Sequence, residues 1–292
     1  MADSRDPVWK HGESIAPGWR SSMFVARSTK ANAGDMATMR VLAQFLGADR
    51  ALGWGRASPD PCDGSWLGIT CDASGYVVYI IANNSGLTGH LPRETRNLSM
   101  LAAIYLNNNS LSGDVPPLGP NLMEISLSYN RFMSISPEFF KDMEIVFSLS
   151  AVNANIIGPI PEFVGDHFKY LGTLKLQGNS LFGHIPTSFA STRIRSVQLQ
   201  DQRGLDKLSG PIFMLNATNI VYLDLHGNQF TGPIPNLASN IEMEYIDLSK
   251  NALTGDVPQS LMQLHHLRVL NLSDNSLCGQ LPKFIKKYDC KD

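Results

Sequence analysis

The sequence predicts an α/β repeat solenoid with a concave parallel β-sheet, and three observations support this prediction. A pattern of the form L-x-x-L-x-L-x-x-N-x-L-x-G-x-I-P recurs through residues 77–282, and residues 220–235 are its clearest copy. Successive copies are about 24 residues apart, within the range of leucine-rich repeats. Asn, Gly and Pro also keep fixed offsets from the leucines. An apolar run in an ordinary α/β domain, which is the alternative, would not place them so regularly.

Each residue type in residues 220–235 has a structural role. The short strand Leu223-Asp224-Leu225 should alternate its side chains between core and solvent. Asn228 follows the strand, where its amide can bond backbone groups that would otherwise be buried and unpaired. Gly232 permits a backbone conformation that a side chain would disfavour, and Pro235 ends any β-ladder. The apolar side chains, each worth roughly 1.5–3 kcal/mol when buried, should stack between copies: Ile220, Leu223, Leu225 and Phe230.

The asparagine position of the pattern identifies nine copies. It falls at Ser85, Asn109, Asn130, Ala154, Asn179, Asp206, Asn228, Asn251 and Asn275. The first copy is irregular, as terminal repeats often are. The sixth copy has four extra residues around residues 202–205, and we expect this insert to bulge at the strand-to-turn edge. Such inserts either join a binding face or reflect neutral loop variation.

The four cysteines lie in two pairs at the ends of the repeat region, Cys62 with Cys71 and Cys278 with Cys290. A solenoid must cover its two end layers, and a short disulfide loop at each end would help, at roughly 2–4 kcal/mol each. Zinc ligation or free thiols are the alternatives, but no His lies near either pair with metal-ligand spacing. Disulfides would place the chain in an oxidising compartment.

Composition and motifs argue against several function classes. The chain has 24 Lys and Arg against 26 Asp and Glu, so bulk charge does not favour nucleic acid or a membrane surface as a partner. No apolar run reaches the roughly 18 residues that span a bilayer. No nucleophile elbow, phosphate loop, H-E-x-x-H or kinase motif occurs. We therefore expect no enzyme activity, no cofactor and no metal site.

The chain divides into four predicted segments. Residues 1–34 lack periodicity and are rich in Ser, Ala, Gly and charge, which predicts disorder. They contain no apolar stretch typical of a secretory signal, so we expect a start further upstream or an alternative or misassigned exon. Residues 35–74 form an N-terminal cap, with helical spacing of apolar residues over 35–46. Residues 75–282 hold the nine repeats, and residues 283–292 form a C-terminal cap or tail.

The cap resembles a known family. Trp54, Pro61-Cys62, Trp66, Gly68 and Cys71 are similar to the N-terminal cap of plant extracellular leucine-rich-repeat proteins. The L-x-G-x-I-P ending is likewise the plant-type variant, which implies a second short strand beside the concave sheet and a superhelical twist.

A narrower resemblance covers residues 36–290. PDPCDGSWLGITC, FMSISPEFF and LNATNIVYLDLHGNQFTGPIPNLAS resemble the first solenoid of the TMK-type (transmembrane kinase) receptor-like kinases. The chain departs from that family in its insert near Arg203 and in the missing signal peptide. It also ends before any second repeat block, membrane helix or kinase domain.

Five Asn-x-Ser/Thr sequons support secretion, although Asn-rich turns raise such a count by chance. They are Asn83, Asn97, Asn108, Asn216 and Asn271. Asn97 and Asn216 lie in return segments and suit glycans best, whereas the other three lie on or beside the concave sheet.

Binding is the remaining function class, and the strand pattern places it on the concave face. One candidate site is an aromatic and acidic ridge with polar flanks: Tyr222, Asp224, His226, Tyr245 and Asp247, flanked by Lys175, Gln198 and Gln200. The other is an exposed apolar patch of Tyr79, Ile81 and Tyr105. Tyr is favoured at binding hot spots, while Asp and His add directional bonds and a pH response in a mildly acidic compartment. Alternatively, strands simply favour Tyr and solvated faces favour Asp.

The sequence therefore predicts an extracellular leucine-rich-repeat ectodomain, or a truncated relative, that binds a peptide or protein ligand and also a co-receptor. The resemblance to TMK-type kinases implies hormone-linked cell-surface signalling, including auxin responses. The alternative is a stand-alone apoplastic protein that inhibits pathogen polysaccharide-degrading enzymes or acts as a decoy for a receptor's ligand.

Overall fold

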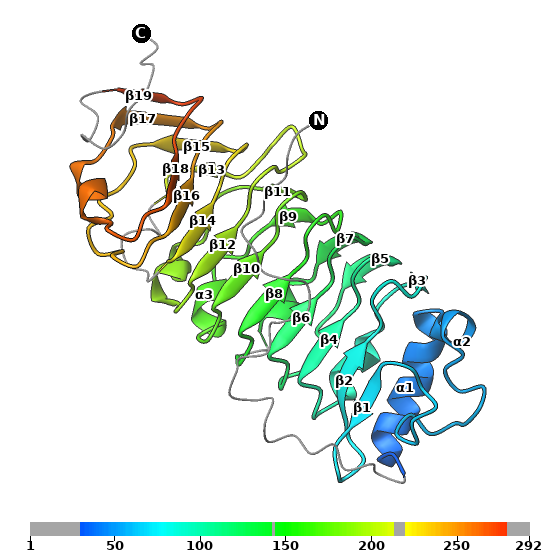
Figure 1. Ribbon diagram of the computed structural model, residues 1–292. Coiled ribbons are helices and arrows are strands. Elements are labelled where there is room, and N and C mark those ends of the chain that lie inside the picture. The colour runs from blue at the N-terminus through cyan, green and yellow to red at the C-terminus, as the bar shows by residue number, and fades with distance from the viewer. Residues whose placement is uncertain (1–29, 142–143, 213–219, 279–292) are drawn as a thin grey trace.

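The computed structural model describes residues 30–141, 144–212 and 220–278, which form a curved solenoid (Figure 1). Its concave face is a ten-stranded sheet in which β1 (Ile69–Cys71) pairs antiparallel with β2 and every later strand pairs parallel with the next. One parallel strand comes from each predicted copy: β2 (Val77–Ile81), β4 (Ala103–Tyr105), β6 (Glu124–Ser126), β8 (Ser148–Ser150), β10 (Thr173–Lys175), β12 (Ser196–Gln198), β14 (Tyr222–Asp224), β16 (Tyr245–Asp247) and β18 (Val269–Asn271). The predicted leucine-rich-repeat solenoid is confirmed.

A second short strand follows in each repeat, as the plant-type ending implies. These strands are β3 (Thr88–Gly89), β5 (Ser110–Val115), β7 (Arg131–Ile135), β9 (Ile157–Pro159), β11 (Ser180–Phe182), β13 (Ser209–Gly210), β15 (Gln229–Gly232), β17 (Ala252–Asp256) and β19 (Ser276–Cys278). They form three parallel sheets, β3-β5-β7, β9-β11 and β13-β15-β17-β19. Gly232 in β15 has a φ of 77°, a conformation that favours glycine.

The return side of the solenoid is short, as predicted. It contains 3-10 helices at Arg93–Asn97, Pro137–Phe140, Thr187–Ser191 and Gln259–Gln263, and the four-residue helix α3 (Val164–His167). The apolar side chains of successive repeats stack between this side and the concave sheet. Ile220, Leu223, Leu225 and Phe230 are fully buried, as their positions in the pattern predict. No helix in the described part of the chain is long and apolar enough to cross a membrane.

The asparagine position forms a hydrogen-bonded ladder inside the solenoid. Asn130 Nδ2 donates to the carbonyls of Leu106 and Leu127, at 2.9 and 3.0 Å. Asn130 Oδ1 accepts from the N–H of Leu111 in the preceding repeat, at 3.0 Å. Asn109, Asn179, Asn251 and Asn275 repeat this arrangement. The ladder therefore satisfies backbone groups that would otherwise be buried without partners.

Each asparagine position is one rung of this ladder, and the rung in the sixth repeat differs from the prediction. Gln202, not Asp206, occupies it: its Nε2 donates to the carbonyls of Leu176 and Leu199, and its Oε1 accepts from the N–H of Leu181. Asp206 is exposed. Glutamine offers the same amide as asparagine on a side chain one methylene longer, which the search for Asn or Asp overlooked. The four extra residues therefore follow the rung rather than precede it.

This placement of the insert affects the next rung. Where two successive repeats are regular, the amide oxygen at the asparagine position of one repeat accepts a backbone N–H from the repeat before it. That N–H belongs to the residue two positions after the earlier repeat's own asparagine position. Beyond Gln202 the chain enters the insert instead. Asn228 still donates to the carbonyls of Leu199 and Leu225, but its buried Oδ1 has no hydrogen-bond partner in the described part of the chain.

The N-terminal cap covers the first repeat with two helices, α1 (Ala33–Phe45) and α2 (Ala48–Ala51). Helix α1 begins two residues before the predicted start, because Asn32 Oδ1 accepts from the Gly34 N–H and caps it. Residues 30–34 thus lie within the cap rather than in a disordered segment. Buried Asp35 joins the helix to the sheet, since its Oδ2 accepts from the Val77 N–H at 2.7 Å.

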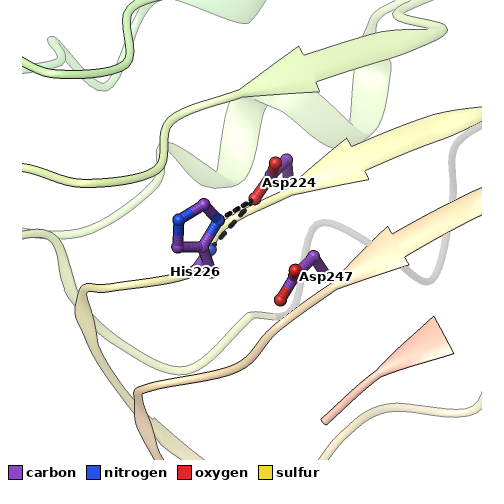
Figure 2. Close-up of side chains that lie close together, drawn as sticks. All are labelled: Asp224, His226 and Asp247. Carbon is purple, nitrogen blue, oxygen red and sulfur yellow. Dashed lines mark hydrogen bonds and ion pairs between the residues drawn. The ribbon is translucent and has the colours of Figure 1, made fainter. Parts of the chain in front are cut away.

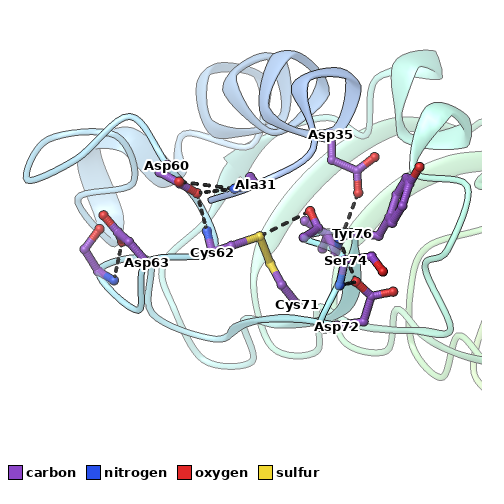
Figure 3. The surroundings of a disulfide bond; sticks show 12 residues. Ala31, Asp35, Asp60, Cys62, Asp63, Cys71, Asp72, Ser74 and Tyr76 are labelled. Atoms are coloured by element: carbon purple, nitrogen blue, oxygen red, sulfur yellow. Dashed lines mark hydrogen bonds between the residues drawn. A yellow bond between two sulfur atoms is a disulfide. The ribbon is translucent and has the colours of Figure 1, made fainter. Parts of the chain in front are cut away.

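The predicted disulfide between Cys62 and Cys71 is confirmed, with a Cα–Cα distance of 5.6 Å (Figure 3). The rings of Trp54 and Trp66 stack beside it, with centroids 5.5 Å apart. Each indole N–H donates to a backbone carbonyl, of Leu67 and Ser58 respectively. Cys290, Asn216, and residues 1–29 and 283–292 lie outside the described residues, so the Cys278–Cys290 bond and the two terminal segments stay predictions.

Candidate functional site

Strands β14 and β16 bring the five residues of the predicted ridge together on the concave face. Tyr222 lies opposite Tyr245 in the parallel register, and their rings stack with centroids 4.2 Å apart and planes 7° from parallel. Both side chains are partly exposed. The same register places Asp224 opposite Asp247. The aromatic pair and the acidic pair thus form two adjacent rows across the same two strands.

His226 contacts two carboxylates. Its Nδ1 is 2.7 Å from Asp224 Oδ1, a contact drawn in Figure 2. Its Nε2 is 3.1 Å from Asp201 Oδ2. Asp201 comes from the turn after β12 and has a φ of 56°. Sequence reasoning missed it because it lies outside the strand positions that face the concave side. A search of the residue directly after the last concave position of each copy, which is Gln200 in this copy, would have found it.

Asp247 is held by three donors. Its Oδ1 accepts from the Ser249 N–H at 2.9 Å and from the Ser249 hydroxyl at 2.6 Å. Its Oδ2 accepts from Asn271 Nδ2 at 3.0 Å. Because these contacts fix both carboxylate oxygens, the orientation of Asp247 is set by its own strand and the next one.

The two acidic residues are less accessible than predicted. Asp224 is 3% exposed and Asp247 is 9% exposed, so they form the floor of the site rather than solvent-facing contacts. Their hydrogen bonds draw them toward neighbouring side chains on the sheet. The partly exposed groups of the ridge are the two tyrosine rings and the imidazole of His226.

The charge state of His226 follows from this geometry. Its hydrogen bond to Asp224 raises the pKa of His226 to about 9, and the charges of Asp224, Asp201 and Asp247 add to the effect, while burial opposes it. Burial raises the pKa of Asp224, and the bond to His226 works against that rise. His226 is therefore protonated in both mildly acidic and neutral solution. The predicted response in a mildly acidic compartment is wrong for this residue.

Of the three predicted flanking residues, Gln198 on β12 joins a polar network. Gln177 Nε2 donates to Gln198 Oε1 at 3.1 Å, and Gln198 Nε2 donates to Ser196 Oγ at 3.4 Å. Gln200 Oε1 is buried and has no hydrogen-bond partner in the described residues. Lys175 is half-buried in the same row as Gln198 and Asp224.

The second predicted site is more polar than expected. The hydroxyl of Tyr105 donates to the carboxylate of Glu124, and Glu124 also raises the pKa of Tyr79 after the larger effect of burial. Of the three predicted residues, only Ile81 is well exposed, at 48%. The sequence reading missed the role of Glu124 because it grouped residues by apolar character alone.

The sequons differ in accessibility. Asn97 and Asn108 are exposed, whereas Asn83 is half-buried and accepts from the Asn107 N–H through Oδ1. Asn271 is half-buried, and the nitrogen that would carry a glycan donates to Asp247 and Ser249. Asn271 therefore belongs structurally to the ridge.

Comparison with known proteins agrees with this architecture. Leucine rich repeat models match residues 121–143 and 218–277, and a leucine rich repeat N-terminal domain model matches residues 33–72. Receptor-like kinase TMK2 of Arabidopsis thaliana is 31% identical over 271 residues, covering 82% of this chain and 30% of TMK2. Receptor-like kinase TMK4 of the same plant is 29% identical over 262 residues, covering 78% of this chain and 28% of TMK4. The chain thus spans less than a third of either relative.

Solved structures of plant receptor ectodomains have the same fold. The GASSHO1/SCHENGEN3 ectodomain of Arabidopsis thaliana, in complex with CASPARIAN STRIP INTEGRITY FACTOR 2, matches with a TM-score of 0.77 and 26% identity over 85% of this chain and 30% of that one. The Arabidopsis receptor kinase HAESA, in complex with the peptide hormone IDA and the co-receptor SERK1, matches with a TM-score of 0.74 and 28% identity over 86% of this chain and 43% of that one.

Proposed function

The chain is a plant-type leucine-rich-repeat ectodomain similar to those of the TMK receptor-like kinases, and from this premise we propose that its concave ridge binds a peptide or protein ligand. The stacked pair of Tyr222 and Tyr245 is the observation that carries the proposal. Two parallel rings offer a large apolar surface with little side-chain entropy to lose on binding.

The floor beneath this aromatic pair supports the same proposal. His226 is cationic and partly exposed, and two mostly buried carboxylates lie beside it. A ligand that packs an apolar group on the rings could therefore place a polar group against His226. The complex of HAESA with the peptide hormone IDA and the co-receptor SERK1 supports a peptide as the ligand and a co-receptor as the second partner.

The setting of the chain follows from the same comparison. We propose that it acts outside the cell in cell-surface signalling, and that binding rather than catalysis is its role. The Cys62–Cys71 disulfide supports an oxidising compartment. The match to TMK2 supports a receptor-like kinase context, and it favours this reading over a stand-alone inhibitor or decoy.

Selection from a random peptide display library tests the ridge. We expect peptides selected on the wild-type ectodomain to lose at least about tenfold in affinity for the double variant Tyr222→Ala, Tyr245→Ala, because truncating a hot-spot residue typically costs about 2 kcal/mol or more. Surface plasmon resonance on the purified proteins would measure the change.

A second pair of tyrosines provides a matched control. Tyr129 and Tyr170 are 52% and 54% exposed and lie outside the strands of the concave sheet. The double variant Tyr129→Ala, Tyr170→Ala removes the same chemical groups, and it should bind the selected peptides as the wild type does. Equal affinity of all three proteins would remove the ridge from the binding site.

A further inference from the structure

We propose that Asp224, His226 and Asp247 bind a divalent transition-metal ion on the concave face. One ligand atom from each of the three residues lies within 4.8 Å of the other two. Figure 2 shows both carboxylates and the imidazole gathered at the ends of β14 and β16. Ligand atoms around one zinc ion lie about 3 Å apart, so small side-chain rotations would suffice to close the group.

The donor set indicates the class of ion. Two carboxylates and one imidazole nitrogen are a mixed oxygen and nitrogen set, which suits zinc and its first-row neighbours. An all-oxygen set would instead favour Mg²⁺ or Ca²⁺. The ion would replace the proton that Asp224 Oδ1 and His226 Nδ1 now share at 2.7 Å.

The outer contacts are an independent argument for a metal site. A histidine that ligates a metal usually donates its other ring N–H to a carboxylate, which fixes the ring and its tautomer. The second ring nitrogen of His226, Nε2, is 3.1 Å from Asp201 Oδ2. Asp247 is likewise oriented by Ser249 and Asn271. Two of the three ligands are therefore held by outer hydrogen bonds.

The burial of the carboxylates points the same way. Asp224 is 97% buried, and the carboxylate opposite it in the parallel register, that of Asp247, is 91% buried. A divalent ion would compensate the charge of both.

This inference does not depend on the proposed peptide site, because the ion binds to the protein alone. Because the divalent ion replaces one proton, it would make the floor of the ridge more positive by about one charge. It would then favour a ligand that presents a carboxylate to the site.

Calorimetric titration tests the proposal directly. Untagged protein, first freed of metal with EDTA and then of the chelator, is titrated with zinc chloride and separately with magnesium chloride. We expect one zinc ion per chain and no measurable magnesium binding. His226→Gln and Asp247→Asn should each weaken zinc binding by at least about 100-fold. Asp201→Asn, which changes only an outer contact, should weaken it by about 10- to 100-fold.

His184 supplies the matched control. It is exposed and pairs with Glu162 at 2.6 Å, but the described residues place no second carboxylate beside it in a metal-binding group. His184→Gln should bind zinc as the wild type does. Absence of zinc binding to the wild type, or equal binding by wild type and His226→Gln, would overturn the proposal.

A measurement on the wild type guards against variants that fail to fold. Co²⁺ added to the protein should broaden the imidazole NMR signals of His226 before those of any other histidine. The adjacent His265 and His266 are both exposed and form the competing site. First broadening at that pair would refute the assignment.

Discussion

The third and fourth repeats and the seventh and eighth repeats share one backbone but present different faces. Strands β6 and β8 pair in the same parallel register as β14 and β16. The first pair presents Glu124 and three serines, Ser126, Ser148 and Ser150, and the second presents two tyrosines and two carboxylates at the equivalent positions. Buried leucines and asparagines determine the backbone fold in both pairs of repeats. The positions that face the concave side are free to differ, and a binding site therefore needs no change in the fold.

The largest expected effect tests whether the scaffold is the same in both regions. Leu149 and Leu223 are equivalent core residues, and both are fully buried. We expect Leu149→Ala and Leu223→Ala each to lower the free energy of unfolding by about 2–5 kcal/mol, because each leaves a cavity in the stacked core. Urea denaturation followed by circular dichroism measures both. A loss below about 1 kcal/mol in either variant would show that one region is not a regular part of the core.

Removing an asparagine of the ladder should cost more stability in a regular repeat than in the repeat that follows the insert. Asn130 uses its amide nitrogen and its oxygen, whereas Asn228 uses its nitrogen alone. Removing either side chain leaves buried carbonyls unpaired, at about 1–3 kcal/mol for each unsatisfied group. Asn130→Ala also leaves the Leu111 N–H without an acceptor, so it should destabilise the protein more than Asn228→Ala by roughly 1 kcal/mol. The opposite order in urea denaturation would contradict this account of the insert.

The smallest effect is a pH dependence confined to the ridge. The pKa of His226 is raised from 6.5 to about 9 in the folded state. The stabilisation of the folded state by protonated His226 is therefore complete below pH 6.5 and is lost as the pH rises through 9. With EDTA present, the difference in unfolding midpoint between wild type and His226→Gln should shrink between pH 6.5 and 10. Ser150→Ala, in the serine-bearing repeats, should show a pH-independent difference from the wild type. A constant difference for His226→Gln would contradict the ion pair.

The repeat pattern predicts the fold well because it is local and recurs nine times. Each copy states its own strand, rung and turn within about 24 residues, so one irregular copy does not hide the others. The prediction for the asparagine position of the sixth repeat was wrong for a physical reason. Gln202 reaches the same carbonyls with a longer side chain, and a search by residue type selected Asp206.

The candidate site is harder to predict because it is built across repeats. The spacing between repeats alone was enough to predict that five residues are neighbours: Tyr222, Asp224, His226, Tyr245 and Asp247. Asp224 and Asp247 are buried with hydrogen bonds to His226, Ser249 and Asn271, which the repeat pattern does not encode. For the same reason the sequence predicted no metal site. The three proposed ligands are spread over two repeats, and their spacing of 2 and 21 residues matches no local motif.

The unpaired oxygen of Asn228 has a consequence for how the molecule should come apart. Each repeat contacts mainly its neighbours, so a linear array opens first at its weakest junction. The junction between the sixth and seventh repeats would divide the chain into a capped block of six repeats and a terminal block that holds the whole tyrosine pair. Amide hydrogen exchange should then be faster in β14 to β18 than in β4 to β12. Loss of ligand binding on warming would precede loss of most of the fold.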